Sequence, residues 1–274
     1  MDYIYRMAGL EIACRLPFDM EIRAESKEFL DLGTTEGDLR FVAEGVDQLP
    51  EPTGLQIGGR YYHEDKTWFC AAKDLPPYAM TQHSPSEIRC FYLRDEAHRL
   101  RYSFNLCDLL SLERILHLHE ALLLHCAFIR MNGEALLFSG ASGVGKSTQA
   151  DLWQVHTSAD LCNGDRAAVR LQNGQWYAHG LPYAGSSHVF RNVQAPCRAI
   201  VMLGQAKENR LRRLRPQEAF SALYPELTLH HWERDTVDRA TSLLTDLISQ
   251  IPVYRLDCLP EESAVQLLYK EVFP

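Results

Sequence analysis

The chain has 274 residues, of which 46% are hydrophobic, and its formal net charge at pH 7 is -8. This length supports a full hydrophobic core and favours one large domain or two of ordinary size. Residues 1–115 hold 13 Lys and Arg against 20 Asp and Glu, so nearly all the acidity lies there. An acidic chain without a basic stripe lacks the electrostatic signature of nucleic-acid binding, so we expect no nucleic-acid partner.

The cysteine pattern and the apolar stretches indicate the compartment. The eight cysteines form no CxxC pair and no zinc-like spacing with histidine, which argues against a metal cage or a disulfide framework. The longest apolar stretches, such as 121–124 and 199–203, are far shorter than the roughly 20 residues that cross a bilayer, and the N-terminus lacks the apolar core of a signal peptide. We therefore expect a cytoplasmic protein with reduced thiols and no membrane partner.

The first part of the chain has the pattern of short strands. Alternating runs separated by Pro, Gly and Asp predict a β-rich N-terminal region over residues 1–115, whose role the sequence does not indicate. These runs cover residues 3–10, 39–43, 68–72 and 89–93. Helical periodicity over 109–122 predicts a helix that joins this region to a second domain at 116–274.

Two Asn-Gly pairs predict hairpins in the second domain. Asn132-Gly133 joins apolar runs over 124–131 and 134–139, and Asn173-Gly174 joins 166–171 to 176–179. Asn-Gly suits a tight type I′ turn, which needs positive φ at both central residues. Because the sheets of common P-loop proteins are parallel, two hairpins near such a motif predict an α/β domain with a mixed sheet.

The rest of the second domain shows alternating strand and helix signals. We expect strands over 198–203 and 253–256, and helices over 216–224, 235–251 and 261–272.

The segment Gly140-Ala-Ser-Gly-Val-Gly-Lys-Ser147 matches the P-loop (Walker A) pattern GxxxxGK[ST]. It follows an apolar strand and precedes a helix-capable stretch, which is the context that the motif requires. The backbone amides of such a loop face one phosphate, the lysine reaches the β- and γ-phosphates, and the serine hydroxyl ligates Mg²⁺. The sequence therefore predicts ATP and Mg²⁺ as ligands and, as nucleotide-binding residues, Gly140, Ser142, Gly143, Val144, Gly145, Lys146, Ser147 and Thr148.

Phosphoryl transfer also needs a carboxylate to hold the metal. Asp165 follows the helix after the P-loop and a further short run, and we predict that it ligates the metal together with Ser147. The alternative for Asp165 is a turn aspartate in the sequence Asn-Gly-Asp. Asp160 is the second choice of carboxylate, and Asp151 fits an exposed helix position better.

Two histidine positions have both a structural and a functional interpretation. His125 lies in the apolar run that leads toward the P-loop, where a lone histidine is usually a core residue. His179 and His188 flank the loop 180–187, whose glycines and hydroxyls fit either a substrate pocket or a surface connection.

Several of these segments together resemble a known family. They are HCAFIRMNGEALLFSGASGVGKST, then CNGDRAAVRL, HGLPYAGSS and AIVMLGQAKENRLRRL, with a late helix rich in Asp and Leu. Residues 116–274 resemble the catalytic domain of HPr kinase/phosphorylase, and more closely the HPr-kinase-like proteins found near peptide-modification genes. The first 115 residues show no such resemblance.

The resemblance implies a P-loop kinase domain of the HPr kinase and phosphoenolpyruvate carboxykinase fold type, with a mixed sheet. It implies transfer of phosphate from ATP, or in some members from pyrophosphate, to a protein serine, and assembly into homo-oligomers. Carried onto this sequence, it makes His125, Lys146 and Asp165 the catalytic residues, with Asp165 and Arg166 on the second half of the family's Asp-Asp-Arg motif.

One position departs from the family pattern. Gly164 stands where the family has the first of its two aspartates, so the identity of the general base is open. Asp165 serves alone, another residue substitutes, or the protein binds nucleotide without efficient transfer. We therefore expect a kinase acting on a hydroxyl of a peptide, protein or small molecule, with a nucleotide-binding adaptor or pseudokinase as the alternative. A carboxykinase is a weaker third interpretation, because the chain is short for such an enzyme.

Overall fold

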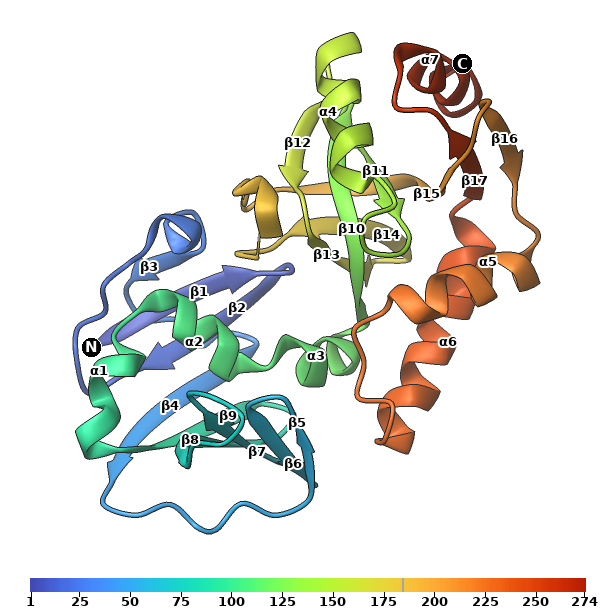
Figure 1. The fold of residues 1–274 in the computed structure, drawn as a ribbon. Helices are drawn as coiled ribbons and strands as arrows, with labels where there is room; N and C mark the ends of the chain where they lie inside the picture. Colours follow the sequence, from blue (N-terminus) through green and yellow to red (C-terminus); the bar gives the residue numbers. More distant parts are fainter. Residues whose placement is uncertain (184) are drawn as a thin grey trace. The chain divides into compact units, whose positions relative to one another are not determined.

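The computed structural model describes residues 1–183 and 185–274, so one position of the loop 180–187 lies outside the described residues. The chain divides into two compact units, Met1–Leu112 and Glu113–Pro274 (Figure 1). The sequence placed this division between residues 115 and 116. Across the described residues, no helix has the length and apolar character needed to span a membrane.

The first unit is built on a nine-stranded sheet with the order β3-β1-β2-β4-β9-β8-β7-β6-β5. The sheet is mixed, because β4 pairs in parallel with both β2 and β9 while the other pairs are antiparallel. The strands are β1 (Asp2–Met7), β2 (Leu10–Arg15), β3 (Leu30–Leu32), β4 (Leu39–Val46), β5 (Leu55–Ile57), β6 (Arg60–His63), β7 (Lys66–Cys70), β8 (Pro77–His83) and β9 (Glu87–Leu93). The helices are η1 (Ala24–Ser26), η2 (Arg94–Glu96), α1 (Ala97–Leu100) and α2 (Ser103–Leu110).

Alternation along the strands of the first unit separates a buried face from an open one. In β2, Leu10, Ile12 and Cys14 are buried while the residues between them are not. The helix α2 has several buried side chains, and the thiol of its Cys107 lies beside the buried hydroxyl of Tyr5 on β1. One face of this sheet is therefore covered by α2, as period-2 alternation predicts.

The second unit is built on an eight-stranded mixed sheet with the order β11-β10-β13-β14-β15-β17-β16, with β12 paired to β10. Its strands are β10 (Ala121–Met131), β11 (Glu134–Ser139), β12 (Asp160–Asn163), β13 (Arg166–Gln172), β14 (Gln175–Gly180), β15 (Gln194–Gln205), β16 (Arg210–Arg213) and β17 (Val253–Cys258). Its helices are α3 (Leu112–Ile115), η3 (Leu116–His119), α4 (Lys146–His156), η4 (Gly185–Ser187), α5 (Pro216–Leu223), η5 (Tyr224–Glu226), α6 (Arg234–Gln250) and α7 (Glu262–Val272).

Two long strands close part of the second sheet into a ring. The first half of β10 pairs with β13 and its second half with β11 and β12. The beginning of β15 pairs with β14, and its continuation pairs in parallel with both β11 and β17. The strands β11, β10, β13, β14 and β15 therefore form a closed ring, which we call the strand ring.

Helices bury both faces of this second sheet. One apolar cluster joins it to α5 and α6, and another joins it to α4 and α7 (Figure 1). On the α4 side, the fully buried ring of Trp153 packs against Phe138 of β11. On the other side, the indole N–H of Trp176 in β14 donates to Asp246 of α6 at 2.9 Å. These layers fix the position of the strand that leads into the glycine-rich segment.

The two predicted hairpins and the mixed sheet are confirmed. β10 pairs with β11 around Asn132-Gly133, and β13 pairs with β14 around Asn173-Gly174. The φ angles of the two asparagines are 52° and 51°, and those of the glycines are 81° and 79°. This is the left-handed conformation that a type I′ turn requires.

The predicted continuous helix over 109–122 is wrong. α2 ends before Ser111, which has a φ of 48°, and η3 ends before Glu120, which has a φ of 56°. β10 then begins at Ala121. A similar correction applies to the run 3–10, which turns at Ala8-Gly9 and belongs to both β1 and β2.

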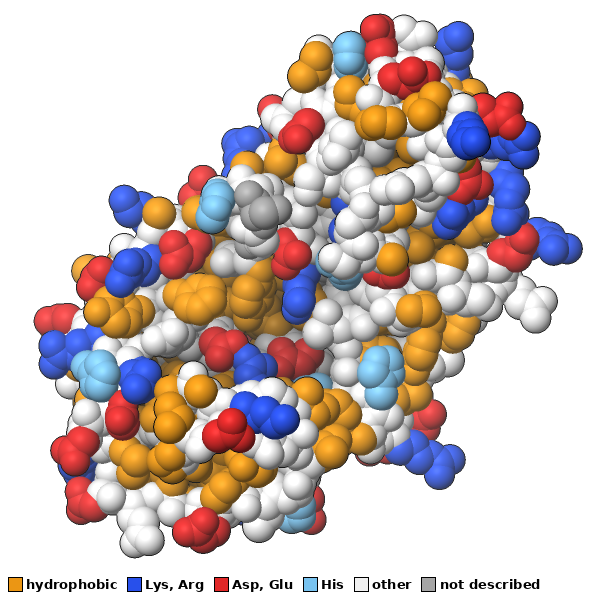
Figure 2. Space-filling view, viewed as in Figure 1, with side chains coloured by type: hydrophobic (Ala, Val, Ile, Leu, Met, Phe, Trp, Pro, Cys, Tyr) orange, Lys and Arg blue, Asp and Glu red, His pale blue; other side chains and the backbone are white. Residues whose placement is uncertain are grey.

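Charges of both signs are interspersed on the visible surface (Figure 2). Ion pairs such as Arg94–Asp47 at 2.8 Å and Arg212–Glu218 at 3.1 Å join neighbouring groups within each unit. Such exposed pairs contribute little to stability, typically about 0–1 kcal/mol each.

Candidate functional site

The glycine-rich segment forms a loop, residues 140–145, between β11 and α4; we call it the glycine loop. Gly140, Gly143 and Gly145 have φ angles of 135°, 78° and 110°, which residues with a Cβ rarely adopt. The amide of Gln149 donates to the carbonyl of Gly145 at 2.9 Å. The amides before Gln149 therefore precede the first i→i−4 bond and lie at the positive end of α4. This arrangement suits an anion.

Lys146, at the start of α4, folds back over the glycine loop. Its Nζ donates to the carbonyl oxygen of Gly140 at 2.8 Å and to that of Ala141 at 3.3 Å. The residue is only 8% exposed. Burial lowers the pKa of Lys146, and the nearby charge of Glu226 is the strongest influence that raises it, followed by Cys126 and Asp165. The Lys146 ammonium is therefore bonded to two loop carbonyls and is influenced by the charges of Glu226 and Asp165.

Glu226 lies close to the glycine loop because the segment that follows η5 pairs with the start of β10. The segment after η5 runs along the start of β10, where Leu227 forms an antiparallel bridge with Leu124 and the amide of Thr228 donates to the carbonyl of Leu123 at 2.8 Å. This places Glu226 beside His125, whose Nδ1 lies 3.1 Å from Oε2 of Glu226. The Glu226 side chain is 14% exposed and that of His125 is 29% exposed.

Asp165 lies in the turn between β12 and β13. The buried Asn163 shapes this turn, because its Oδ1 accepts the amides of Asp165 at 2.9 Å and Arg166 at 3.0 Å. The amide of Cys126 donates to the Asp165 carbonyl at 3.0 Å, which ties the turn to β10. The Asp165 carboxylate pairs with Nε of Arg166 at 3.3 Å.

Asn163 also holds the loop that follows β14. Its Nδ2 donates to the carbonyls of Leu181 at 2.7 Å and Tyr183 at 2.6 Å. A Cβ on Gly185, whose φ is 52°, would lie 3.1 Å from the Cβ and Oδ1 of Asp165. The loop therefore passes directly against the Asp165 side chain.

A cavity of about 540 Å³ opens beside the glycine loop. Its described lining includes Glu226 and Arg255, but not Lys146, Ser147, His125 or Asp165. The lining residues are Gly140, Ala141, Ser142, Gly143, Val144, Met202, Leu203, Gly204, Gln205, Ala222, Glu226 and Arg255. The glycine loop, Glu226 and Arg255 therefore line the same cavity.

The end of β15 and the strand β17 shape the far wall of this hollow. Arg255 pairs with Asp257 at 2.7 Å, and both lie over Gly204, where a Cβ would collide with Nη2 of Arg255 and Oδ1 of Asp257. The side chain of Gln205 donates to the carbonyl of Gly143 at 3.2 Å. Arg255 therefore places a cation in the lining of the cavity, held by its pair with Asp257.

The structure separates the sequence candidates into two groups. The glycine loop, Lys146, His125 and Asp165 come together, and Ser147 and Thr148 are exposed on the first turn of α4. Asp160 instead pairs with Arg130 at 3.2 Å, and Asp151 is exposed farther along α4.

Sequence reasoning missed Glu226 and Arg255. Glu226 lies in the mostly apolar stretch 219–229, and Arg255 lies in a short strand. No local spacing relates either residue to the glycine loop. The only available signal was a carboxylate within an otherwise apolar stretch.

The carboxylates and hydroxyl at the site are hard oxygen donors of the kind that suit Mg²⁺. They are provided by Ser147, Asp165 and Glu226. Across residues 1–183 and 185–274, no group of three or more His, Cys, Asp and Glu side chains is placed to hold a metal ion. Magnesium usually takes one or two carboxylates plus substrate phosphates, so this donor set fits an ion that arrives with a nucleotide.

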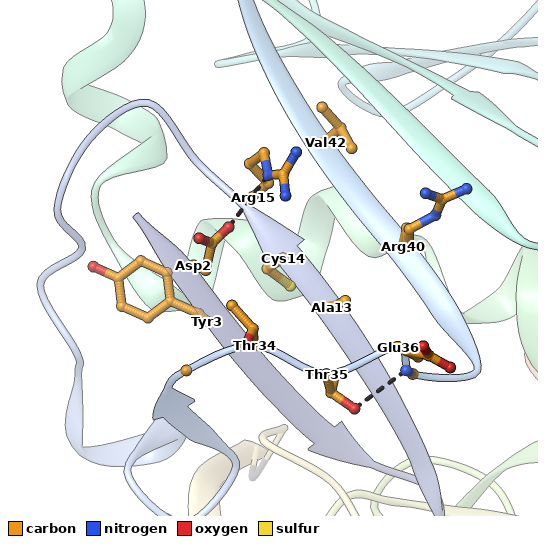
Figure 3. A pocket seen from close by; sticks show the side chains of 12 residues that line it. Asp2, Tyr3, Ala13, Cys14, Arg15, Thr34, Thr35, Glu36, Arg40 and Val42 are labelled. Carbon is orange, nitrogen blue, oxygen red and sulfur yellow. Dashed lines mark hydrogen bonds and ion pairs between the residues drawn. The ribbon is translucent and has the colours of Figure 1, made fainter.

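A second cavity, of about 630 Å³, lies on the first unit (Figure 3). The loop 33–37 crosses over β1, β2 and β4 there, and the hydroxyl of Thr35 accepts the amide of Gly37 at 3.2 Å. Of its two basic lining residues, Arg15 pairs with Asp2 at 3.3 Å and Arg40 with Glu87 at 3.9 Å. None of the predicted site residues lies in this unit.

The fold and this site define a mixed α/β protein with a glycine loop between a buried strand and a helix. A family model described as "SynChlorMet cassette protein ScmC" matches residues 104–260, which is more than half of the chain. The chain therefore belongs to the ScmC family. No curated protein matches the chain.

Among solved structures, the HPr(Ser) kinase/phosphatase from Coxiella burnetii is similar to this chain with a TM-score of 0.32 and 11% identity. The match covers 54% of this chain and 94% of that one.

Proposed function

We propose that this protein is an ATP-dependent kinase that transfers phosphate to a hydroxyl, with a serine or threonine of a peptide or protein as the preferred acceptor. A small hydroxylated molecule is the second acceptor class. The observation that carries this proposal is the buried Lys146 ammonium, which is bonded to the carbonyls of the glycine loop and whose pKa the nearby charges of Glu226 and Asp165 raise. Phosphoryl transfer requires a positive charge, amide donors for the phosphate and carboxylates, and here these are Lys146, the first turn of α4, and Glu226 with Asp165.

Each residue has a defined task in this proposal. The amides of Gly143 and of residues 145–148 bind the phosphate oxygens, and Lys146 leaves its carbonyl partners to neutralise charge on the β- and γ-phosphates. Ser147 and Asp165 would hold Mg²⁺, which supplies charge neutralisation when bound. Arg255, in the cavity wall, contacts the nucleotide phosphates or the acceptor.

The test compares wild type with Lys146→Ala and with Lys207→Ala as a matched control, since Lys207 is exposed and lies outside the cavity lining. Calorimetry measures the binding of ATP with Mg²⁺, and phosphate release measures turnover in water. We expect binding and slow turnover in wild type and Lys207→Ala, and loss of both in Lys146→Ala.

Three other outcomes of this test would favour or exclude particular functions. Binding without turnover in wild type would favour the nucleotide-binding adaptor, for which Gly164→Asp should then create activity. Turnover that does not depend on Lys146 would rule out the glycine loop as the transfer site. The absence of ATP binding in wild type would contradict both the kinase and the adaptor.

A further inference from the structure

We propose that Glu226 is the catalytic carboxylate that takes the proton from the attacking hydroxyl, and that His125 is the residue that positions it. This inference rests on the proposed kinase function and assigns the base that the sequence left open. Phosphoryl transfer needs a group that orients the nucleophile in addition to a carboxylate that holds the metal. The residue next to Asp165 is Gly164, which has no side chain to supply that second group.

Glu226 is better placed for this task than Asp165. Glu226 lines the cavity at the glycine loop, and its charge acts on Lys146. Asp165 instead pairs with Arg166 at 3.3 Å, in the turn between β12 and β13. We therefore assign Mg²⁺ binding to Asp165 and activation of the nucleophile to Glu226.

The contact with His125 fixes the direction of the Glu226 carboxylate. An ionised carboxylate only accepts hydrogen bonds, so Nδ1 of His125 is the donor across the 3.1 Å contact with Oε2. The backbone of His125 is tied to β11, because its carbonyl accepts the hydroxyl of Ser139 at 2.8 Å. Because Oε2 accepts this bond, we assign Oε1 as the oxygen that takes the proton.

The step balances as a single displacement. The acceptor oxygen forms a bond to the γ-phosphorus while its proton passes to Oε1 of Glu226. The bond from the γ-phosphorus to the β–γ bridging oxygen breaks, and the electron pair leaves with ADP. Glu226 then returns its proton to solvent, so no further reactant is needed.

The first experiment uses the full chain with MgATP and with water as the phosphate acceptor. Glu226→Gln keeps the shape of the side chain and removes its basicity, and Glu208→Gln is the control because Glu208 is exposed and lies outside the cavity lining. General-base catalysis contributes about 10²–10⁴-fold, so we expect kcat to fall about 100-fold in Glu226→Gln. The KM for ATP and the calorimetric affinity for MgATP should stay within about threefold of wild type.

The second experiment tests the positioning role of His125. In Asn, the amide nitrogen lies close to the place of Nδ1, so His125→Asn keeps the donor to Glu226 while His125→Ala removes it. We expect His125→Ala to lower kcat about tenfold at unchanged KM, and His125→Asn to restore most of the loss. An equal loss in both variants would show that the imidazole acts in another way.

Three results would overturn the assignment of Glu226. A loss of kcat smaller than about tenfold in Glu226→Gln would show that the carboxylate is dispensable. Recovery of Glu226→Gln at higher Mg²⁺ concentration would make Glu226 a metal ligand instead of the base. The absence of Lys146-dependent turnover in wild type would contradict the proposed kinase function itself. The first two results would contradict only the role of Glu226.

Discussion

Nδ1 of His125 lies 3.1 Å from Oε2 of Glu226, although 101 positions separate the two residues in the sequence. The contact exists because the chain leaves η5 along the start of β10, with Leu227 bridged to Leu124. The segment between α5 and α6 is therefore part of the site, and substitutions there should alter function as well as stability.

Asp165→Asn should raise the Mg²⁺ concentration that gives half-maximal turnover by about tenfold or more, because it removes a negative charge from the metal site. Asp160→Asn is the matched control, since Asp160 belongs to the adjacent β12 and pairs with Arg130. Phosphate release measured across a MgCl₂ series checks this prediction. Equal half-saturation in wild type and Asp165→Asn would contradict the assigned role.

Arg255→Ala should weaken ATP binding about tenfold, or about 1.4 kcal/mol, because a hydrogen-bonded cation is lost from the cavity wall. Arg212→Ala is a suitable control, since Arg212 lies on the neighbouring β16 and pairs with Glu218 instead. Calorimetry with MgATP measures the difference. If Arg255→Ala binds ATP as wild type does, Arg255 contacts the acceptor or has no ligand.

Gly204→Ala should have an effect similar to that of Arg255→Ala. A methyl group at position 204 would displace both Arg255 and Asp257 from the surface of β15. Local crowding should lower the free energy of unfolding by about 1–3 kcal/mol. The double variant should bind ATP no more weakly than either single variant, because both changes act on the same guanidinium. Additive losses in a double-mutant cycle would show that Gly204 acts independently of Arg255.

His179 should make the folded state sensitive to acid. It is 4% exposed, its Nε2 has no hydrogen-bond partner among the described residues, and burial lowers its pKa from 6.5 to about 4. Between these values the unfolded chain binds a proton that the folded chain does not, so the free energy of unfolding falls as the pH falls. The contribution of this one group is on the order of 3 kcal/mol at pH 4 relative to pH 7.

Urea unfolding at pH 7 and at pH 4.5 measures this dependence. His179→Gln should lose part of it, whereas the exposed His63→Gln should keep the dependence of wild type. An unchanged pH slope in His179→Gln would contradict the assignment.

Local chemistry made parts of the second unit predictable. The Asn-Gly pairs determine a conformation by themselves, so the turns at Asn132 and Asn173 followed from two residues each. From those hairpins the mixed character of the sheet also followed, although the sequence contained no sign that β15 pairs back with β11 to close the strand ring.

The error over 109–122 has a physical origin. Apolar residues at helical spacing are equally compatible with a short helix, a turn and the start of a buried strand. Ser111 and Glu120 stop the helices through left-handed backbone conformations, which neither residue type signals strongly. The tertiary packing of β10 determines that the residues from Ala121 onward form a strand and not a helix.

Apart from His125, which the family resemblance implied, the candidate site was predictable only where its residues are neighbours in the sequence. The glycine loop and Lys146 form one motif, and Asp165 follows after a single helix and strand. Glu226 and Arg255 reach the loop through pairings of distant segments, to β10 and β15. A single sequence gives no spacing rule for such approaches.

The strand ring has a consequence for how the protein responds to a nucleotide. Each of its five strands is hydrogen-bonded on both sides within the ring, so the base of the glycine loop is a rigid frame. Adjustment on binding should therefore be confined to two attachments outside the frame: the η5 segment that brings Glu226 and the loop that Asn163 holds at Leu181 and Tyr183. We expect these two segments to move on nucleotide binding while the strand ring stays fixed. Amide hydrogen exchange with and without MgATP should therefore show protection in these segments first.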